Sequence, residues 1–369
     1  MPAMNTTYEV KQRFPVEKVR KALGIKKLPI LSAISSIGKI DTTGIEWYED
    51  EVIGLFTTGT GTGTGGEITN TDTTINVATA DVFAVGDIVE IENERVQVTG
   101  VDYAANTITV VRGFQGTTAA THPANSKLEV VSSVATEGNL TGASRVSEPV
   151  KHSNVTQVFQ DNLYLTGSLE AISPEWAKSE KARQVRQKIF RLDSLKARSV
   201  WYGIRFDSTS EKKRTMGGIN FYVANKVDAG GVALTPDMII DQIIAMNNDG
   251  VFDMGLMPEI WINPSYQKII NSWWDSKLLV ERTDEKVGRK VLKLVTNQGD
   301  IAIKYDRTIK EGDLFLIDPA EVKKATLRPD GMEKLAKTDD GQKYLLLEEF
   351  TIKVEYPSAW RKLENIAAP

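Results

Sequence analysis

The sequence predicts an α+β fold that carries a separate small β-barrel or β-sandwich. Three observations support this: a long helical pattern over residues 173–203, an all-β pattern over 67–132, and alternating strand and helix patterns over 219–334. The 369 residues are enough for two or three modest domains. With 41% hydrophobic and 25% charged residues, the composition is that of a globular protein.

Residues 1–56 are expected to form an N-terminal arm. From Glu9 to Lys27 the chain carries seven basic and two acidic residues, and a short amphipathic helix is predicted there, ended by Gly24. The sequence supports two interpretations of this segment equally. It is either a solvated terminal helix or an arm that packs on a neighbouring subunit.

Residues 57–66 are rich in Gly and Thr and are predicted to be a flexible linker. No Gly-Lys-Ser/Thr follows them, so a phosphate-binding loop is disfavoured. The β-module is predicted over about 67–131, where turn residues separate β-branched runs. Its acidic residues are expected to form a solvated face, because they lack the spacing of a metal-binding loop. The predicted strands are Thr74–Val77, Ile88–Ile91, Val96–Val101 and Thr107–Val111.

One long helix is predicted over 174–202. Ser173 is a favourable N-cap, Pro174 suits the first helical position, and Gly203 is expected to be a left-handed residue after the last turn. Eight Lys or Arg residues and a narrow apolar stripe indicate a strut: only the narrow stripe is expected to be buried, and the rest of the helix surface is charged. The stripe consists of Val185, Ile189, Leu192 and Leu195.

The remainder is predicted to be a compact α/β domain followed by one long strand, Tyr344–Glu355, which returns beside the long helix. Thr235 followed by Pro236 predicts a helix start, and Asn263 followed by Pro264 predicts another, for a helix over Ser265–Trp274. The predicted strands of this domain are Phe221–Val223, Glu259–Ile262, Val291–Val295, Ile301–Tyr305 and Leu314–Ile317.

Residues for catalysis, metals or cofactors are scarce. The chain has no cysteine and two histidines, His122 and His152, which argues against disulfides, thiolate chemistry, zinc sites and histidine-based triads. Glu348 and Glu349 are expected on opposite faces of a strand, where they cannot act together as a general acid and a general base. We therefore expect no enzyme activity, no catalytic residue, no metal site and no cofactor.

Charge and hydropathy limit the partners. A net charge of −4 argues against a dedicated nucleic-acid binder. No apolar run reaches membrane-spanning length, and the N-terminus lacks the apolar core of a signal peptide. A membrane partner is therefore not expected.

Several segments, in this order, resemble the major capsid proteins of tailed bacteriophages with the HK97 fold, specifically the SU10-like major head protein branch. They are Asn154–Phe159, Tyr164–Gly167, Arg214–Ile219, Asn297–Asp318 and Leu327–Pro329. The segment from Val85 to Gly113, with His122, is similar to a small β-module that recurs in phage virion proteins.

The resemblance implies an icosahedral shell that encloses double-stranded DNA without binding it specifically. The expected partners are further copies of the chain in hexamers and pentamers, portal and scaffolding proteins, and decoration proteins. The expected location is the virion capsid, assembled in the bacterial host cytoplasm. Alternatives are an encapsulin-like shell, another virion structural protein, and a phage hydrolytic enzyme.

The same resemblance implies a domain division and a set of assembly residues. The expected domains are the arm (1–56), an extended loop with the β-module (57–150), a peripheral (P) domain (151–215 and 335–369) with a spine helix at 174–202, and an axial (A) domain (216–334). The candidate subunit-interface residues are Lys18, Arg20, Lys21, Trp176, Arg183, Arg186, Arg191 and Trp274.

Overall fold

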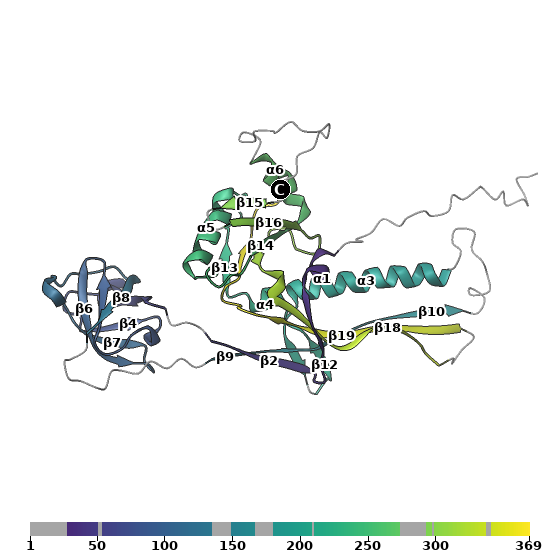
Figure 1. Cartoon of the computed structure of the whole chain (residues 1–369), viewed down its shortest axis with the longest axis horizontal. Coiled ribbons are helices and arrows are strands. Elements are labelled where there is room, and N and C mark those ends of the chain that lie inside the picture. The colour runs from purple at the N-terminus through teal and green to yellow at the C-terminus, as the bar shows by residue number, and fades with distance from the viewer. Residues whose placement is uncertain are drawn as a thin grey trace, which may run out of the picture. The chain divides into compact units, whose positions relative to one another are not determined.

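The computed structural model describes residues 28–50, 54–134, 149–166, 180–208, 210–273, 293–296, 299–336 and 341–369. It divides the chain into two compact units, shown in Figure 1. We call Tyr48–His152 the barrel unit, and we call the chain up to Trp47 together with Ser153–Pro369 the framework.

The barrel unit is a closed six-stranded barrel, so the prediction of a small β-barrel is confirmed. Its interior holds the apolar side chains of alternate strand residues, among them Ile75, Val96, Ile108 and Leu128. In barrel order the strands are β3 (Phe56–Thr60), β4 (Thr74–Val77), β7 (Thr107–Val111), β6 (Glu94–Asp102), β5 (Asp87–Ile91) and β8 (Ser126–Ser133).

The prediction of a flexible linker over residues 57–66 is wrong, because β3 lies there and pairs with both β4 and β8. A Cβ atom at position 59 would stand 2.7 Å from Leu128 Cδ1, so the glycine leaves room for that side chain in the barrel interior. The following turn is held by the carboxylate of Asp72, which accepts the backbone N–H groups of Thr62 and Thr69 at 3.0 and 2.8 Å. The Gly/Thr-rich composition suggested a linker, although part of this segment forms a strand.

The framework contains a four-stranded sheet that carries the long helix. The strand order is β1 (Ser35–Lys39), β18 (Val322–Lys334), β19 (Gly341–Val354) and β10 (Gln157–Thr166). Strand β10 pairs with β19 without irregularity from Gln157 opposite Phe350 to Thr166 opposite Gly341. Helix α3 (Glu180–Tyr202) lies along these strands (Figure 1). The predicted helix start at Ser173 and Pro174 lies outside the described residues.

The predicted apolar stripe of this helix is only partly buried. Leu192 is 4% exposed, but Ile189 and Leu195 are 38% and 47% exposed. Near its end the helix instead buries Trp201, whose ring lies 5.7 Å from that of Trp261 and 4.8 Å from that of Phe315. The buried side thus changes along the helix, because the first turns rest on one sheet and the last turns are enclosed by two.

Gly203 ends the helix for a reason other than the predicted one. Its φ is not left-handed. A Cβ atom at this position would lie 2.5 Å from the carbonyl oxygen of Met216 and 2.6 Å from that of Ser199. Gly218 donates its backbone N–H to the Gly203 carbonyl at 2.9 Å. Glycine is required by the close approach of two backbone segments.

The second framework sheet has six strands and corresponds to the predicted α/β region. The predicted strand Phe221–Val223 is wrong. Phe221 and Tyr222 belong to helix α4 (Ile219–Tyr222), and the next strand begins at Asn225. The Thr235 cap is confirmed, since its side chain accepts the N–H of Met238 at the start of α5 (Pro236–Asn248). In sheet order the strands are β13 (Asn225–Asp228), β20 (Arg361–Glu364), β17 (Leu314–Ile317), β14 (Glu259–Ile262), β16 (Gly299–Tyr305) and β15 (Lys293–Thr296).

Short elements complete the described chain. The remaining helices and strands are α1 (Pro29–Ala33), α6 (Gln267–Ser272), the paired strands β2 (Gly44–Glu49) and β9 (Val150–Val155), and the hairpin of β11 (Phe206–Ser208) and β12 (Lys213–Thr215). The 3-10 turns are Thr64–Gly66, Ala80–Val82, Phe114–Gly116, Pro264–Tyr266 and Pro319–Glu321. None of the described helices has both the length and the apolar character needed to cross a membrane.

Candidate assembly interface

Two of the predicted interface arginines lie on different flanks of helix α3. Arg186 and Arg191 are both exposed and form no ion pair with the described residues. They are five residues apart, which places them about 140° apart around a helix axis. Arg183 is half-buried and engaged in an interaction. The other predicted residues lie outside the described residues: Lys18, Arg20, Lys21, Trp176 and Trp274.

Arg191 belongs to a continuous exposed strip that we call the basic flank of α3: Arg191, Leu195 and Arg198. Spacings of four and three residues place the three side chains on one side of the helix. Neither arginine has an ion-pair partner in the described part of the chain. The flank therefore offers two free cations around one exposed leucine.

The helix is fixed to the sheet by a buried ionic cluster that the sequence analysis missed. The Lys196 ammonium of α3 lies 2.6 Å from one carboxylate oxygen of Glu348 on β19, and the Lys324 ammonium of β18 lies 2.5 Å from the other. Burial works to raise the pKa of Glu348, but the hydrogen bonds and charges of both lysines outweigh it and lower that pKa. Glu348 is therefore an anion that joins three elements.

Glu349 makes a second cluster with different partners. Its carboxylate accepts hydrogen bonds from the Thr156 hydroxyl at 2.7 Å, Arg214 of β12 at 3.0 Å and Arg328 of β18 at 2.7 Å. Burial opposes ionisation, but these donors lower the pKa of Glu349. Adjacent strand residues face opposite sides of a sheet, so the two glutamates serve separate structural roles.

Asn154, which opens the first of the resembling segments, joins three parts of the framework. Its side-chain amide donates to the carbonyls of Gly217 and Ile352 at 2.9 and 2.7 Å, and its oxygen accepts the Gly217 N–H at 2.8 Å. Three residues later in that segment, the Gln157 side chain accepts the N–H of Met216 at 3.2 Å. The motif is therefore a structural clasp, with every polar atom of the buried Asn154 side chain engaged.

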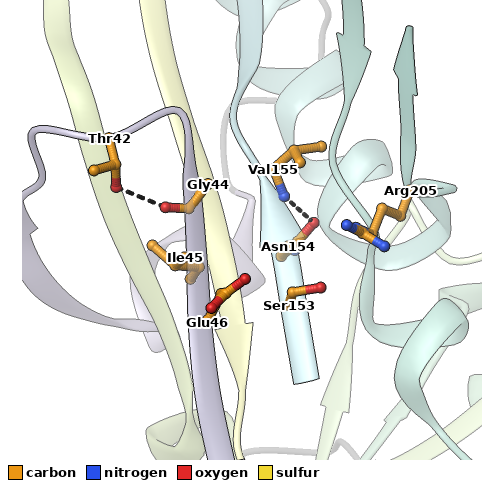
Figure 2. A pocket seen from close by; sticks show the side chains of 8 residues that line it. All are labelled: Thr42, Gly44, Ile45, Glu46, Ser153, Asn154, Val155 and Arg205. Atoms are coloured by element: carbon orange, nitrogen blue, oxygen red, sulfur yellow. Dashed lines mark hydrogen bonds between the residues drawn. The ribbon is translucent and has the colours of Figure 1, made fainter. Parts of the chain in front are cut away.

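A pocket of about 430 Å³ lies beside this clasp, as Figure 2 shows. Its side chains offer one carboxylate (Glu46) and one guanidinium (Arg205), with no nucleophile next to a base. Among the described residues, no group of three or more His, Cys, Asp or Glu side chains could hold a metal ion. The lining residues are Thr42, Gly44, Ile45, Glu46, Ser153, Asn154, Val155 and Arg205.

The barrel unit has its own buried cluster. Arg112 approaches both oxygens of Glu94 at 2.7 Å, and the Nε2 atom of His122 lies 2.9 Å from the same carboxylate. Burial works to raise the pKa of Glu94, yet hydrogen bonds from Arg112, Ala120, His122 and Gly113 lower it to about 2. Because Glu94 is fully engaged, this cluster is structural rather than catalytic.

Comparisons with known proteins agree with the fold. The family model for the SU10 major capsid protein matches residues 5–367. None of the curated proteins matches the sequence. The capsid of cyanophage A-1(L) is similar in structure, with a TM-score of 0.57 and 8% identity over 98% of both chains. The capsid of an empty GTA particle gives a TM-score of 0.53 and 10% identity over 99% of this chain and 100% of that chain.

An encapsulin is also among the similar structures. The SrpI encapsulin of Synechococcus elongatus gives a TM-score of 0.43 and 11% identity over 61% of this chain and 79% of that chain. The longer structural matches confirm the predicted HK97-like capsid fold. The family is one of structural capsid proteins, not of enzymes. Because its family model spans nearly the whole sequence, this chain belongs to the SU10 major capsid protein family.

Proposed function

We propose that the chain is the major head protein of a tailed bacteriophage, with copies arranged in hexamers and pentamers that close into an icosahedral shell around double-stranded DNA. The observation that carries this proposal is the family match over residues 5–367. A closed shell requires each subunit to present rigid faces that other copies can cover. The framework supplies such faces on α3 and on its sheets, and internal ion pairs hold them in place.

The DNA is enclosed rather than specifically bound. The chain has 45 basic and 49 acidic residues, so there is no general excess of cations to neutralise phosphates. A shell that encloses DNA does not require specific contacts to DNA bases. Portal, scaffolding and decoration proteins are the proposed further partners, and the host cytoplasm is the proposed place of assembly.

The exposed arginines of α3 are proposed to contact other copies. Arg186 and Arg191 are free of ion pairs in the described chain, so each can pair with an acidic group of a neighbour without breaking an internal contact. Lys18, Arg20, Lys21, Trp176, Arg183 and Trp274 remain proposed interface residues on the sequence argument.

Negative-stain electron microscopy of the purified full-length chain tests this proposal. Closed shells, tubes or regular sheets of capsomers are expected, whereas a monomer that persists at every protein concentration would contradict it. The contents separate two kinds of shell. Nuclease-protected DNA in particles from infected cells supports a phage head, and an enclosed protein cargo without DNA would indicate an encapsulin-like compartment.

A further inference from the structure

Helix α5 presents an unusual outer face. Four consecutive outward positions carry Asp237, Ile240, Asp241 and Ile244, which we call the acidic ridge of α5. Ile240 is 38% exposed and Ile244 is 47% exposed. The opposite side of the helix is buried in the framework core through Ile239, Gln242, Ile243 and Met246.

The composition of the ridge indicates a contact surface. Asp237 lies in the first turn, where a carboxylate also stabilises the helix dipole, but Asp241 lies beyond that turn. Neither carboxylate has an ion-pair partner among the described residues. Two exposed isoleucines that alternate with two carboxylates, both without an ion pair in the described part of the chain, are typical of a face that is covered in an assembly.

The basic flank of α3 complements this ridge. Each face spans eight residues of helix, and the seven steps between the first and the last cover about 10 Å along the axis. One face carries two carboxylates that alternate with two isoleucines, and the other carries two guanidinium groups on either side of Leu195; none of these four charged groups has an ion pair within the described residues. Arginine and carboxylate groups form strong, directional pairs, particularly where apolar groups exclude water around them.

We infer that the acidic ridge of α5 in one copy docks against the basic flank of α3 in the next copy. The two faces are different surfaces of the same chain, so the contact is head-to-tail and repeats from copy to copy until a ring closes. This inference rests on the proposed shell function, and it adds which faces meet within a capsomer.

Charge identifies the occupant as protein rather than DNA. The acidic ridge repels phosphates, and an oligonucleotide would leave its two isoleucines uncovered. A second copy satisfies both faces at once, because each copy brings the complement of the other's surface. Contact between exposed charges also predicts sensitivity to ionic strength.

Charge reversal tests the inference. The ridge variant is Asp237→Lys with Asp241→Lys, and the flank variant is Arg191→Glu with Arg198→Glu. Each is expected to raise the protein concentration needed for assembly by about tenfold or more, because four like charges then face one another. The dissociated subunits should melt within a few degrees of the unmodified chain, since of the four residues only Asp237 also stabilises a helix dipole in the first turn. The matched control is Lys226→Glu with Lys268→Glu, two exposed cations outside both faces, and it should assemble normally.

Rescue decides the question. An equimolar mixture of the ridge variant and the flank variant should form six-membered capsomers again, because copies that alternate around an even-numbered ring place each positive face against a negative face. The chain that carries all four substitutions should also assemble. No recovery in either sample, normal assembly of either two-residue variant, or equal failure of the control would each overturn the inference. The unmodified chain, measured in parallel, reports on the proposed function independently.

A folding defect would not end the test. Should a reversal variant melt early, the neutral pairs Asp237→Asn with Asp241→Asn and Arg191→Gln with Arg198→Gln replace it. Their combination is expected to assemble no worse than either pair alone, since both remove the same contact. Strictly additive losses would contradict the docking.

Discussion

The two units of this protein use buried carboxylates in different ways. In the barrel unit, Glu94 is engaged by Arg112 and His122, only 18 and 28 residues away in sequence. In the framework, Glu349 is engaged by Arg214 and Thr156, which are 135 and 193 residues away. One network is local to a module, and the other ties together segments from distant parts of the chain.

This difference indicates that the barrel unit can fold by itself, whereas the framework folds only when segments from distant parts of the chain come together. The barrel has its own apolar core, and its entry and exit strands are neighbours, with Phe56 paired to Glu129. The framework core and ion pairs require α3, β12, β18 and β19 together. We therefore expect the two units to unfold in separate transitions, which allows each change below to be assigned to one unit.

Removing the central carboxylate of the framework should have the largest effect. In Glu348→Ala the buried Lys196 loses its closest anionic partner, and breaking a buried pair in this way costs about 3–5 kcal/mol. Calorimetry should show the framework transition shifted down and the barrel transition unchanged. The control Glu129→Ala, an exposed residue paired with Lys127, should alter neither transition. A shift of the barrel transition in Glu348→Ala would show that the two units do not unfold independently.

A cavity beneath α3 should have the next largest effect. Leu192→Ala is expected to lower the free energy of unfolding of the framework by about 2–5 kcal/mol, since this leucine is nearly fully buried. The same change at the exposed Leu195 should cost the dissociated subunit about 0.5 kcal/mol or less and act on assembly instead. Equal losses of subunit stability in urea unfolding would show that the helix is buried on both sides.

The barrel should respond to acid through Glu94. Because its pKa is lowered to about 2 in the folded state, its stabilising contribution is complete above the ordinary glutamate pKa near 4.5 and is lost as the pH falls from there toward 2. Circular dichroism melts of residues 54–134 across this pH range should show the loss. Glu94→Gln should be less stable at neutral pH and should flatten this pH dependence. An unchanged profile in that variant would assign the acid sensitivity to other groups.

The smallest effect on subunit stability is expected at Arg186. Its side chain is exposed and unpaired in the described chain, so Arg186→Ala should change the free energy of unfolding by about 0.5 kcal/mol or less. If the residue contacts a neighbour, assembly yield and its salt dependence should change instead. Early melting combined with normal assembly would place Arg186 in the core and refute the strut interpretation.

Much of the fold was predictable because local patterns and tertiary structure agree. The runs Thr74–Val77 and Thr107–Val111 match barrel strands residue for residue, and the Thr235 cap begins α5 as expected. The order of segments such as Asn154–Phe159 was sufficient to indicate the family. These features depend on neighbouring residues in the chain, which a sequence displays directly.

The remaining features depend on contacts between distant segments. The strand at Phe56–Thr60 is stabilised by Leu128 and other residues across the barrel, so its Gly/Thr composition alone suggested a linker. Lys196 was counted among the charges on the helix surface, although it pairs with Glu348 in the interior. Ile189 was assigned to the buried stripe, because nothing in the periodicity shows where the helix changes its neighbours.

We expect the framework to contain the surfaces that build the shell and the barrel to be a separate module. Sedimentation velocity of a chain in which a short Gly/Ser linker replaces residues 55–134 tests it most directly. The linker connects the chain that follows β2 to the chain that precedes β9, and these two strands pair with each other, so the framework should keep its fold. This variant is expected to sediment as closed particles, as the full chain does. A variant that keeps the framework melting transition but remains monomeric would contradict the claim.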